Sequence, residues 1–153
     1  CYAGMRYSDF VNMKPDNIVE MHQETWLIYK SIKTGTEVRL PLYLLFSGKG
    51  ILILNKYQAN LQDFFHLRDN SNVNKELIII ARLAGVAKKV SFHTARHTNA
   101  TLLIYNGVNI TTVQKLLGHK SVKTTQIYTN VMDATIISDL EKNHSSVHRK
   151  KGK

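Results

Sequence analysis

One stretch decides how the chain folds, SFHTARHTNATLLIYNGVNITTVQKLLGHKSVKTTQIYT, which runs from Ser91 to Thr129. Apolar residues recur in it at helical spacing, so ATLLIYNG and NITTVQKLLG predict two helices that end at Gly107 and Gly118. Ser121 is a typical N-cap residue and predicts a third helix over the remaining residues. The stretch therefore predicts three helices joined by short turns.

Four polar residues interrupt the apolar pattern of this stretch. His93 and Arg96 are three residues apart, which places them on one helix face within reach of a common ligand. His119 follows the predicted stop at Gly118, and the third predicted helix carries Tyr128 back toward it. Cationic and imidazole side chains beside a phenol are suited to chemistry on a phosphodiester.

The order HxxR, LGH and a tyrosine nine positions after that histidine resembles the catalytic domain of the tyrosine recombinases, the phage integrase family. Upstream, AGMRYSD is similar to the first motif of the family and KTGTEVRLP to its β-hairpin, so that the resemblance spans nearly the whole chain. It implies a set of catalytic residues comprising Arg6, Lys33, His93, Arg96, His119 and Tyr128, with Asp9 in a supporting role.

The remaining segments predict an α+β fold, mainly α-helical, with a small antiparallel β-sheet near its start. IVEMH, TWLIYK and VRLPL have the β-branched and aromatic content of strands, and Lys33 falls at the turn between the last two. Four further segments are predicted as a short helix over 4–13, a turn and core helix over 43–57, a surface loop over 60–74 and a helix over 74–84.

Composition limits the class of protein. The 153 residues suffice for one domain, and a hydrophobic content of 43% indicates a globular chain. The net charge of +10 favours a polyanionic partner, although a ribosome or a membrane surface would also suit it. A single cysteine suits a reducing compartment, and there is no apolar run of about 20 residues and no signal peptide. The resemblance implies the bacterial cytoplasm, at the nucleoid, without membrane contact.

The ends of the chain suggest how it is divided. Because Cys1 directly precedes the first motif, we expect an N-terminally truncated fragment, with an integrase-type catalytic domain over 1–143. Residues 133–143 form a short amphipathic pattern, and the resemblance implies an exchange helix there that docks on a neighbouring protomer of a tetramer on DNA. The isolated fragment could be a monomer. Residues 144–153 are polar and basic and are expected to be disordered.

The residue types suggest a reaction that needs no metal or cofactor. Forked guanidinium groups can neutralise a phosphate, and a lysine can protonate the leaving oxygen. His93 and His97 have metal-ligand spacing, but the acid of HExxH and a third ligand are missing, so His97 is predicted to pack or cap. The resemblance implies that Tyr128 forms a 3′-phosphotyrosine and frees a 5′-hydroxyl during integration or excision of a mobile element.

Two other functions remain open at this point. A type IB topoisomerase shares the mechanism but relaxes supercoils, and His93 favours a recombinase over it because such enzymes commonly lack that histidine. A helix-turn-helix regulator would explain two helices within 108–128 but not Arg6, Lys33 or the HxxR spacing. Taken alone, Arg6 and Asp9 read as a surface ion pair, and Lys33 as a solvated turn residue.

Overall fold

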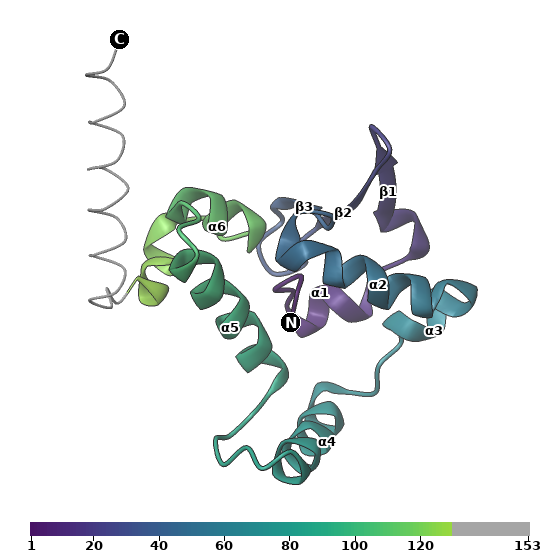
Figure 1. Cartoon of the computed structure of the whole chain (residues 1–153), viewed down its shortest axis with the longest axis vertical. Helices are drawn as coiled ribbons and strands as arrows, with labels where there is room; N and C mark the ends of the chain where they lie inside the picture. Colours follow the sequence, from purple (N-terminus) through teal and green to yellow (C-terminus); the bar gives the residue numbers. More distant parts are fainter. Residues whose placement is uncertain (130–153) are drawn as a thin grey trace, which may run out of the picture.

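The computed structural model describes residues 1–129. Helices precede and follow a three-stranded sheet (Figure 1). The α-helices and strands are α1 (Tyr7–Val11), β1 (Ile18–Met21), β2 (Glu24–Lys30), β3 (Glu37–Pro41), α2 (Lys49–Lys56), α3 (Leu61–Phe65), α4 (Asn70–Leu83), α5 (Phe92–Tyr105) and α6 (Ile110–Leu116). The short 3-10 turns are η1 (Pro15–Asn17), η2 (Leu45–Gly48), η3 (Gln58–Asn60), η4 (Val122–Thr124) and η5 (Gln126–Tyr128).

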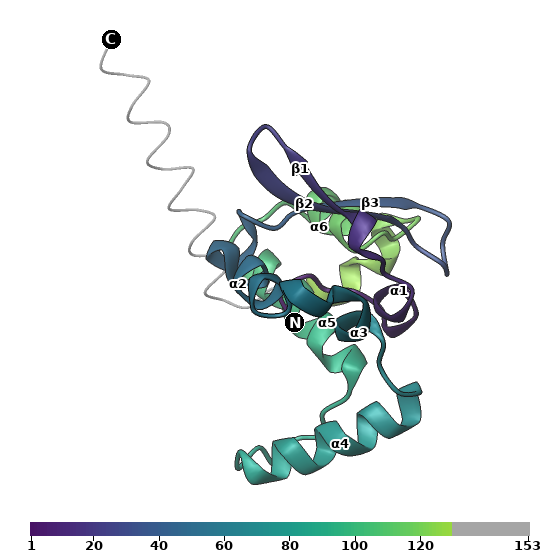
Figure 2. The same cartoon turned by 90° about the vertical axis from the view of Figure 1, so that its right-hand side faces the viewer.

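The sheet is antiparallel with strand order β1-β2-β3, as its sequence predicts. Leu27 pairs with Leu40 and Tyr29 with Val38, and all four side chains are buried. Because side chains alternate across a strand, these residues form the single inner face of the sheet. Strand β3 packs against α6, which the two views place beside it (Figures 1 and 2).

One apolar core joins the sheet to α1, α3, α5 and α6. Its buried members are Met5, Met13, Leu27, Tyr29, Val38, Leu40, Leu42, Leu45, Phe65, Ala100, Leu103, Val113 and Leu117. Helix α4 lies away from the sheet and contacts α5 (Figure 2). The predicted fold class, mainly helical with a small antiparallel sheet near the N-terminus, is confirmed.

Three predicted segments differ from the structure upstream of α5. The predicted surface loop over 60–74 is wrong, because it contains α3 with the buried Phe65 and the first turns of α4. Asp69 caps α4 by accepting from the amides of Ser71 and Asn72, so this polar run is a helix start. Helix α2 contains no buried residue, and the first helix covers only Tyr7–Val11 of the predicted range 4–13.

The third helix predicted after Ser121 is wrong as well. The hydroxyl of Ser121 does accept from the amide of Lys123, but η4 and η5 follow in place of an α-helix. Thr125 and Tyr128 recur at three residues, which is the period of the 3-10 helix. A second helix for a helix-turn-helix is therefore not formed within residues 110–129.

Two predicted features fall beyond this region. The exchange helix over 133–143 and the basic tail over 144–153 lie outside the described residues. Within residues 1–129, the helices are all too short or too polar to span a bilayer.

Candidate active site

Arg96 occupies the centre of the candidate site. Helix α5 starts with a capping box between Ser91 and Thr94, which turns Arg96 inward until the residue is only 1% exposed. Its Nη1 donates to the carbonyl of Gly4 at 2.7 Å. Its Nη2 donates to the carbonyl of Leu117 at 2.6 Å and lies 2.9 Å from His119 Nε2. The guanidinium therefore ties the N-terminal segment and α5 to the end of α6.

His119 is held in one tautomer by its two neighbours. A guanidinium can only donate, so His119 Nε2 accepts from Arg96 and the proton of the ring resides on Nδ1. Nδ1 donates to the hydroxyl of Thr125 at 2.9 Å, and the Thr125 side chain is fully buried. Burial, and next the charge of Arg96, lower the pKa of His119 to about 4. The imidazole is therefore neutral at pH 7, and its Nε2 accepts a hydrogen bond from Arg96.

Arg6 and Asp9 form a pair that reaches into the protein. Arg6 Nη1 lies 3.6 Å from Asp9 Oδ2 and donates to the hydroxyl of Ser31 at 3.0 Å. Asp9 has no exposed surface and also accepts from the amide of Ile32 at 2.9 Å and from the Ser31 hydroxyl. The pair is therefore not the surface ion pair that the two residues suggest by themselves. It connects the start of α1 to the turn between β2 and β3.

The two arginines meet at the turn formed by residues 117–119, called here the LGH turn. Arg6 Nη1 lies 3.5 Å from the Leu117 carbonyl, the same oxygen that accepts from Arg96. Carbonyls at the end of a helix carry partial negative charge and attract cations. Burial, followed by the charge of Arg6, lowers the pKa of Arg96 to about 10. Two cations are thus held close together by acceptors of the protein itself.

Lys33 lies exposed in the turn between β2 and β3, as predicted. The amide of Ile32, just before it, binds Asp9, and the hydroxyl of Thr34, just after it, donates to the carbonyl of Gly118 at 3.0 Å. Burial and the charges of His97, Arg96 and Arg6 lower the pKa of His93, and the charge of Lys33 adds the smallest contribution.

His97 packs against both His93 and the predicted nucleophile. The ring of His97 lies 4.5 Å from that of His93 and 5.3 Å from that of Tyr128, between centroids. This agrees with the packing role predicted for His97. Sequence reasoning assigned no role to Ser31, Thr34 or Thr125, which bind the predicted site residues.

Tyr128 is half-buried on η5, which packs against α5. Burial raises the pKa of its phenol, and the charges of Arg96 and Arg6 oppose that rise without cancelling it. The contact of η5 with α5 places Tyr128 against the helix that carries Arg96, where its ring packs on His97.

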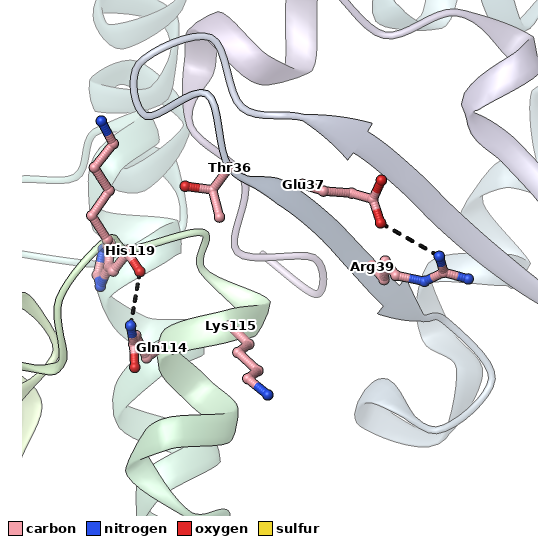
Figure 3. A pocket seen from close by; sticks show the side chains of 7 residues that line it. Thr36, Glu37, Arg39, Gln114, Lys115 and His119 are labelled. Carbon is pink, nitrogen blue, oxygen red and sulfur yellow. Dashed lines mark hydrogen bonds and ion pairs between the residues drawn. The ribbon is translucent and has the colours of Figure 1, made fainter.

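An open cavity of about 750 Å³ borders the site between β3 and α6 (Figure 3). Its lining residues are Thr36, Glu37, Arg39, Gln114, Lys115, His119 and Lys120. In Figure 3 the amide of Gln114 points to the carbonyl of His119, and the two groups form a hydrogen bond of 3.0 Å. Glu37 and Arg39 pair across 3.4 Å at the strand side of the cavity. The cavity brings solvent to the rim of the LGH turn.

The structure brings the predicted residues together from four separate segments. Arg6, Arg96 and His119 are joined directly by hydrogen bonds or a shared acceptor. The turn that carries Lys33 is bonded to Gly118 through Thr34, and η5, which carries Tyr128, packs against α5. Such a set can bind a phosphate and attack it with a phenol. Fold and site together define a protein whose candidate site is suited to binding a phosphate beside a phenol.

Comparison with known proteins establishes the family. A family model described as the phage integrase family matches residues 1–135, and the chain belongs to this family. Tyrosine recombinase XerD of Listeria monocytogenes is 50% identical over 146 residues, covering 84% of this chain and 46% of the relative. Tyrosine recombinase XerC of Rickettsia bellii is 41% identical over 155 residues, covering 95% and 48%. The chain thus spans about half the length of these relatives.

Solved structures agree with the fold. The crystal structure of XerA recombinase superposes with a TM-score of 0.72 at 27% identity, covering 93% of this chain and 54% of the other. A lambda integrase dimer bound to a COC′ core site superposes with a TM-score of 0.66 at 23% identity, covering 84% and 39%. The second likeness concerns the fold alone.

Proposed function

We propose that this chain is the catalytic part of a site-specific recombinase that cuts and rejoins strands of double-stranded DNA. The observation that carries the proposal is the convergence of Arg6 and Arg96 on the Leu117 carbonyl, with Tyr128 on η5, which packs against the helix that carries Arg96. Relatives with 41% and 50% identity are named tyrosine recombinases, which supports the same reaction class here. The net charge of +10 suits a DNA partner.

In the proposed cleavage step, the Tyr128 oxygen attacks the scissile phosphorus. A bond forms between the phenolic oxygen and phosphorus, and the bond between phosphorus and the 5′-oxygen breaks. The phenol proton passes to the neutral imidazole of His93, whose pKa is lowered by burial and by neighbouring cations. Lys33 gives a proton to the departing 5′-oxygen, which leaves a 3′-phosphotyrosine and a free 5′-hydroxyl. Rejoining reverses each transfer, so neither water nor a nucleotide is consumed.

The arginines have different parts in this scheme. Arg6 keeps 12% of its side chain exposed and is the guanidinium that a phosphate meets first. Within residues 1–129, three of the five N–H groups of Arg96 already bind protein acceptors. Its two remaining N–H groups are the ones that bind the phosphate together with Arg6. Removing a preorganised donor of this kind typically slows the chemical step about 10²-fold or more.

The nucleophile provides the most direct test of the proposed reaction. Inverted repeats near the gene that the protein protects from nuclease define a duplex, which is then nicked beside the scissile phosphate to trap the covalent adduct. Tyr128→Phe should abolish the adduct, and Tyr105→Phe, at a 56% exposed tyrosine on α5, should leave its yield unchanged. Full adduct yield in the Tyr128 variant would refute the assignment of the nucleophile.

The arginines and the type of reaction are tested on the same duplex. Arg6→Ala and Arg96→Ala should each slow adduct formation by about two orders of magnitude or more. Exchange of strands between two labelled duplexes indicates a recombinase, whereas relaxation of a single supercoiled plasmid without exchange indicates a topoisomerase. The recombinase proposal fails if only relaxation is seen.

We place this activity in the bacterial cytoplasm, at the nucleoid, in the integration or excision of a mobile element. Other copies of the chain are the proposed partners, in a tetramer on DNA, with residues 133–143 as the exchange helix between protomers. Deleting the chain from Asp133 onward should weaken assembly on the protected duplex in native gels while leaving the melting temperature of the catalytic domain in place. Unchanged assembly would count against the exchange helix.

A further inference from the structure

The turn that carries Lys33 is anchored on both sides of the lysine. The preceding residue, Ile32, donates its amide to the buried Asp9 at 2.9 Å. The following residue, Thr34, donates its hydroxyl to the carbonyl of Gly118 at 3.0 Å, across 84 positions of sequence. Lys33 itself is exposed. Its backbone is therefore fixed at two points while its side chain is free to swing.

The acceptor of the Thr34 hydroxyl lies in the LGH turn, beside the groups that hold the arginines. The carbonyl of Leu117 accepts from both guanidinium groups, and the next carbonyl, that of Gly118, accepts from Thr34. The bond from Thr34 thus ties the lysine turn to the same three residues that fix Arg6 and Arg96. No other side-chain hydrogen bond within residues 1–129 joins this turn to the LGH turn.

We propose that Thr34 is a positioning residue that holds the Lys33 turn against the LGH turn, so that the lysine amine reaches the leaving 5′-oxygen. This inference rests on the proposed function, because it needs Lys33 to act as the general acid. Thr34 touches neither the phosphate nor the leaving oxygen. A turn freed from Gly118 lets the amine sample many positions, and a displacement of about 1 Å can cost roughly 10²-fold in rate.

The test exploits a leaving group that needs no acid. A nicked duplex is made on the protected site with sulfur in place of the bridging 5′-oxygen, because a thiolate departs without being protonated. Thr34→Val keeps the shape of the side chain and removes the donor, whereas Thr34→Ser keeps the hydroxyl. Thr36→Val is the matched control, since the hydroxyl of this half-buried residue in the same turn forms no side-chain hydrogen bond within residues 1–129.

With the oxygen-linked duplex, adduct formation by Thr34→Val should slow about tenfold to a hundredfold, while Thr34→Ser and Thr36→Val remain within about twofold of the parent. With the sulfur-linked duplex, Thr34→Val should match the parent within about twofold. Parental rates on both duplexes overturn the inference. Equal slowing on both also overturns it, because loss of folded structure or of phosphate binding affects both leaving groups.

Lys33→Ala separates a failure of this inference from a failure of the proposed function. If Lys33 is the general acid, this variant is slow on the oxygen-linked duplex and recovers on the sulfur-linked one. If the rate of Lys33→Ala recovers on the sulfur-linked duplex but Thr34→Val has no effect, only the positioning role of Thr34 is refuted. If the rate of Lys33→Ala does not recover on the sulfur-linked duplex, Lys33 is not the general acid, and the positioning role of Thr34 is refuted as well.

Discussion

The buried hydroxyl of Thr125 should decide the tautomer of His119, and Thr125→Val isolates its contribution. The hydroxyl accepts the Nδ1–H of His119 at 2.9 Å, and Thr125 is fully buried. Valine has nearly the same shape, so the change leaves a buried N–H without an acceptor. Such an orphaned donor costs about 1–3 kcal/mol, which should appear as an equal loss in the free energy of unfolding.

The effect should extend from stability to the reaction. Without Thr125, the proton of the His119 ring gains nothing from residing on Nδ1, and the Nε2–H tautomer then points a donor at the Arg96 guanidinium. We therefore expect Thr125→Val to slow adduct formation about tenfold or more, as the guanidinium shifts away from its place beside the phosphate. Urea unfolding gives the stability change, and adduct yield against time gives the rate.

Thr124→Val is the matched control for this prediction. Thr124 precedes Thr125 in the chain, is exposed, and its side chain forms no hydrogen bond within residues 1–129. Its substitution should change the free energy of unfolding by less than about 0.5 kcal/mol. If both valine variants unfold at the same urea concentration and cleave at the same rate, the tautomer of His119 is not set by Thr125 and the reasoning is refuted.

Three further changes probe the same network. Asp9→Asn should destabilise the fold by about 1–3 kcal/mol in urea and slow cleavage, because an amide offers Ser31 and Arg6 less acceptor capacity than a carboxylate. Gly118→Ala should lower the melting temperature strongly, since φ is +61° there and the new Cβ would lie 2.6 Å from a Val38 methyl. Because the pKa of His119 is about 4 in the folded chain and about 6.5 in the unfolded chain, only the unfolded chain binds a proton there between pH 7 and pH 5. The free energy of unfolding therefore falls as the pH falls. The parent should lose about 1–2 kcal/mol more than His119→Gln over this range, as measured by urea unfolding at both pH values.

Each of these three predictions has an outcome that would contradict it. Gly35→Ala is the control for Gly118→Ala, because φ is +66° there too but no atom lies within 4 Å of the added Cβ. Equal melting temperatures for the two alanine variants would remove the steric argument. A parent and a His119→Gln variant with parallel pH curves would contradict the lowered pKa of His119. Asp9→Asn with parental stability and rate would show that the buried carboxylate is dispensable.

The sequence predicted most of the fold because its signals were local. β-Branched and aromatic content located the three strands, and glycines with positive φ follow the ends of the helices at 107 and 118 as expected. The secondary-structure predictions were wrong where the same residue pattern is compatible with two kinds of local structure. The polar run at 68–74 resembles a loop, yet Asp69 makes it the start of α4. The three-residue recurrence after Ser121 fits one face of an α-helix loosely and a 3-10 turn well.

The residues of the candidate site could be chosen from motif spacing, but their connections could not. Arg6, Arg96 and Thr34 all bind backbone carbonyls of the LGH turn, and a carbonyl is present at every position whatever the residue type. The tautomer of His119 depends on Thr125, which the sequence marks only by its place one turn before Tyr128. Sequence therefore indicates which groups are present, whereas the fold decides which group donates and which accepts.

The cluster is assembled before any phosphate binds, at an electrostatic cost that a phosphate would relieve. Burial and the charge of Arg6 lower the pKa of Arg96 to about 10, which means that the surroundings disfavour the guanidinium charge although the group stays charged at pH 7. The carbonyl of Leu117 offsets part of that cost with a partial negative charge. A phosphate brings a full negative charge, and the transition state of its cleavage brings more. Cations that are held together at a cost in the free protein therefore stabilise the transition state more than the ground state, as differential binding requires.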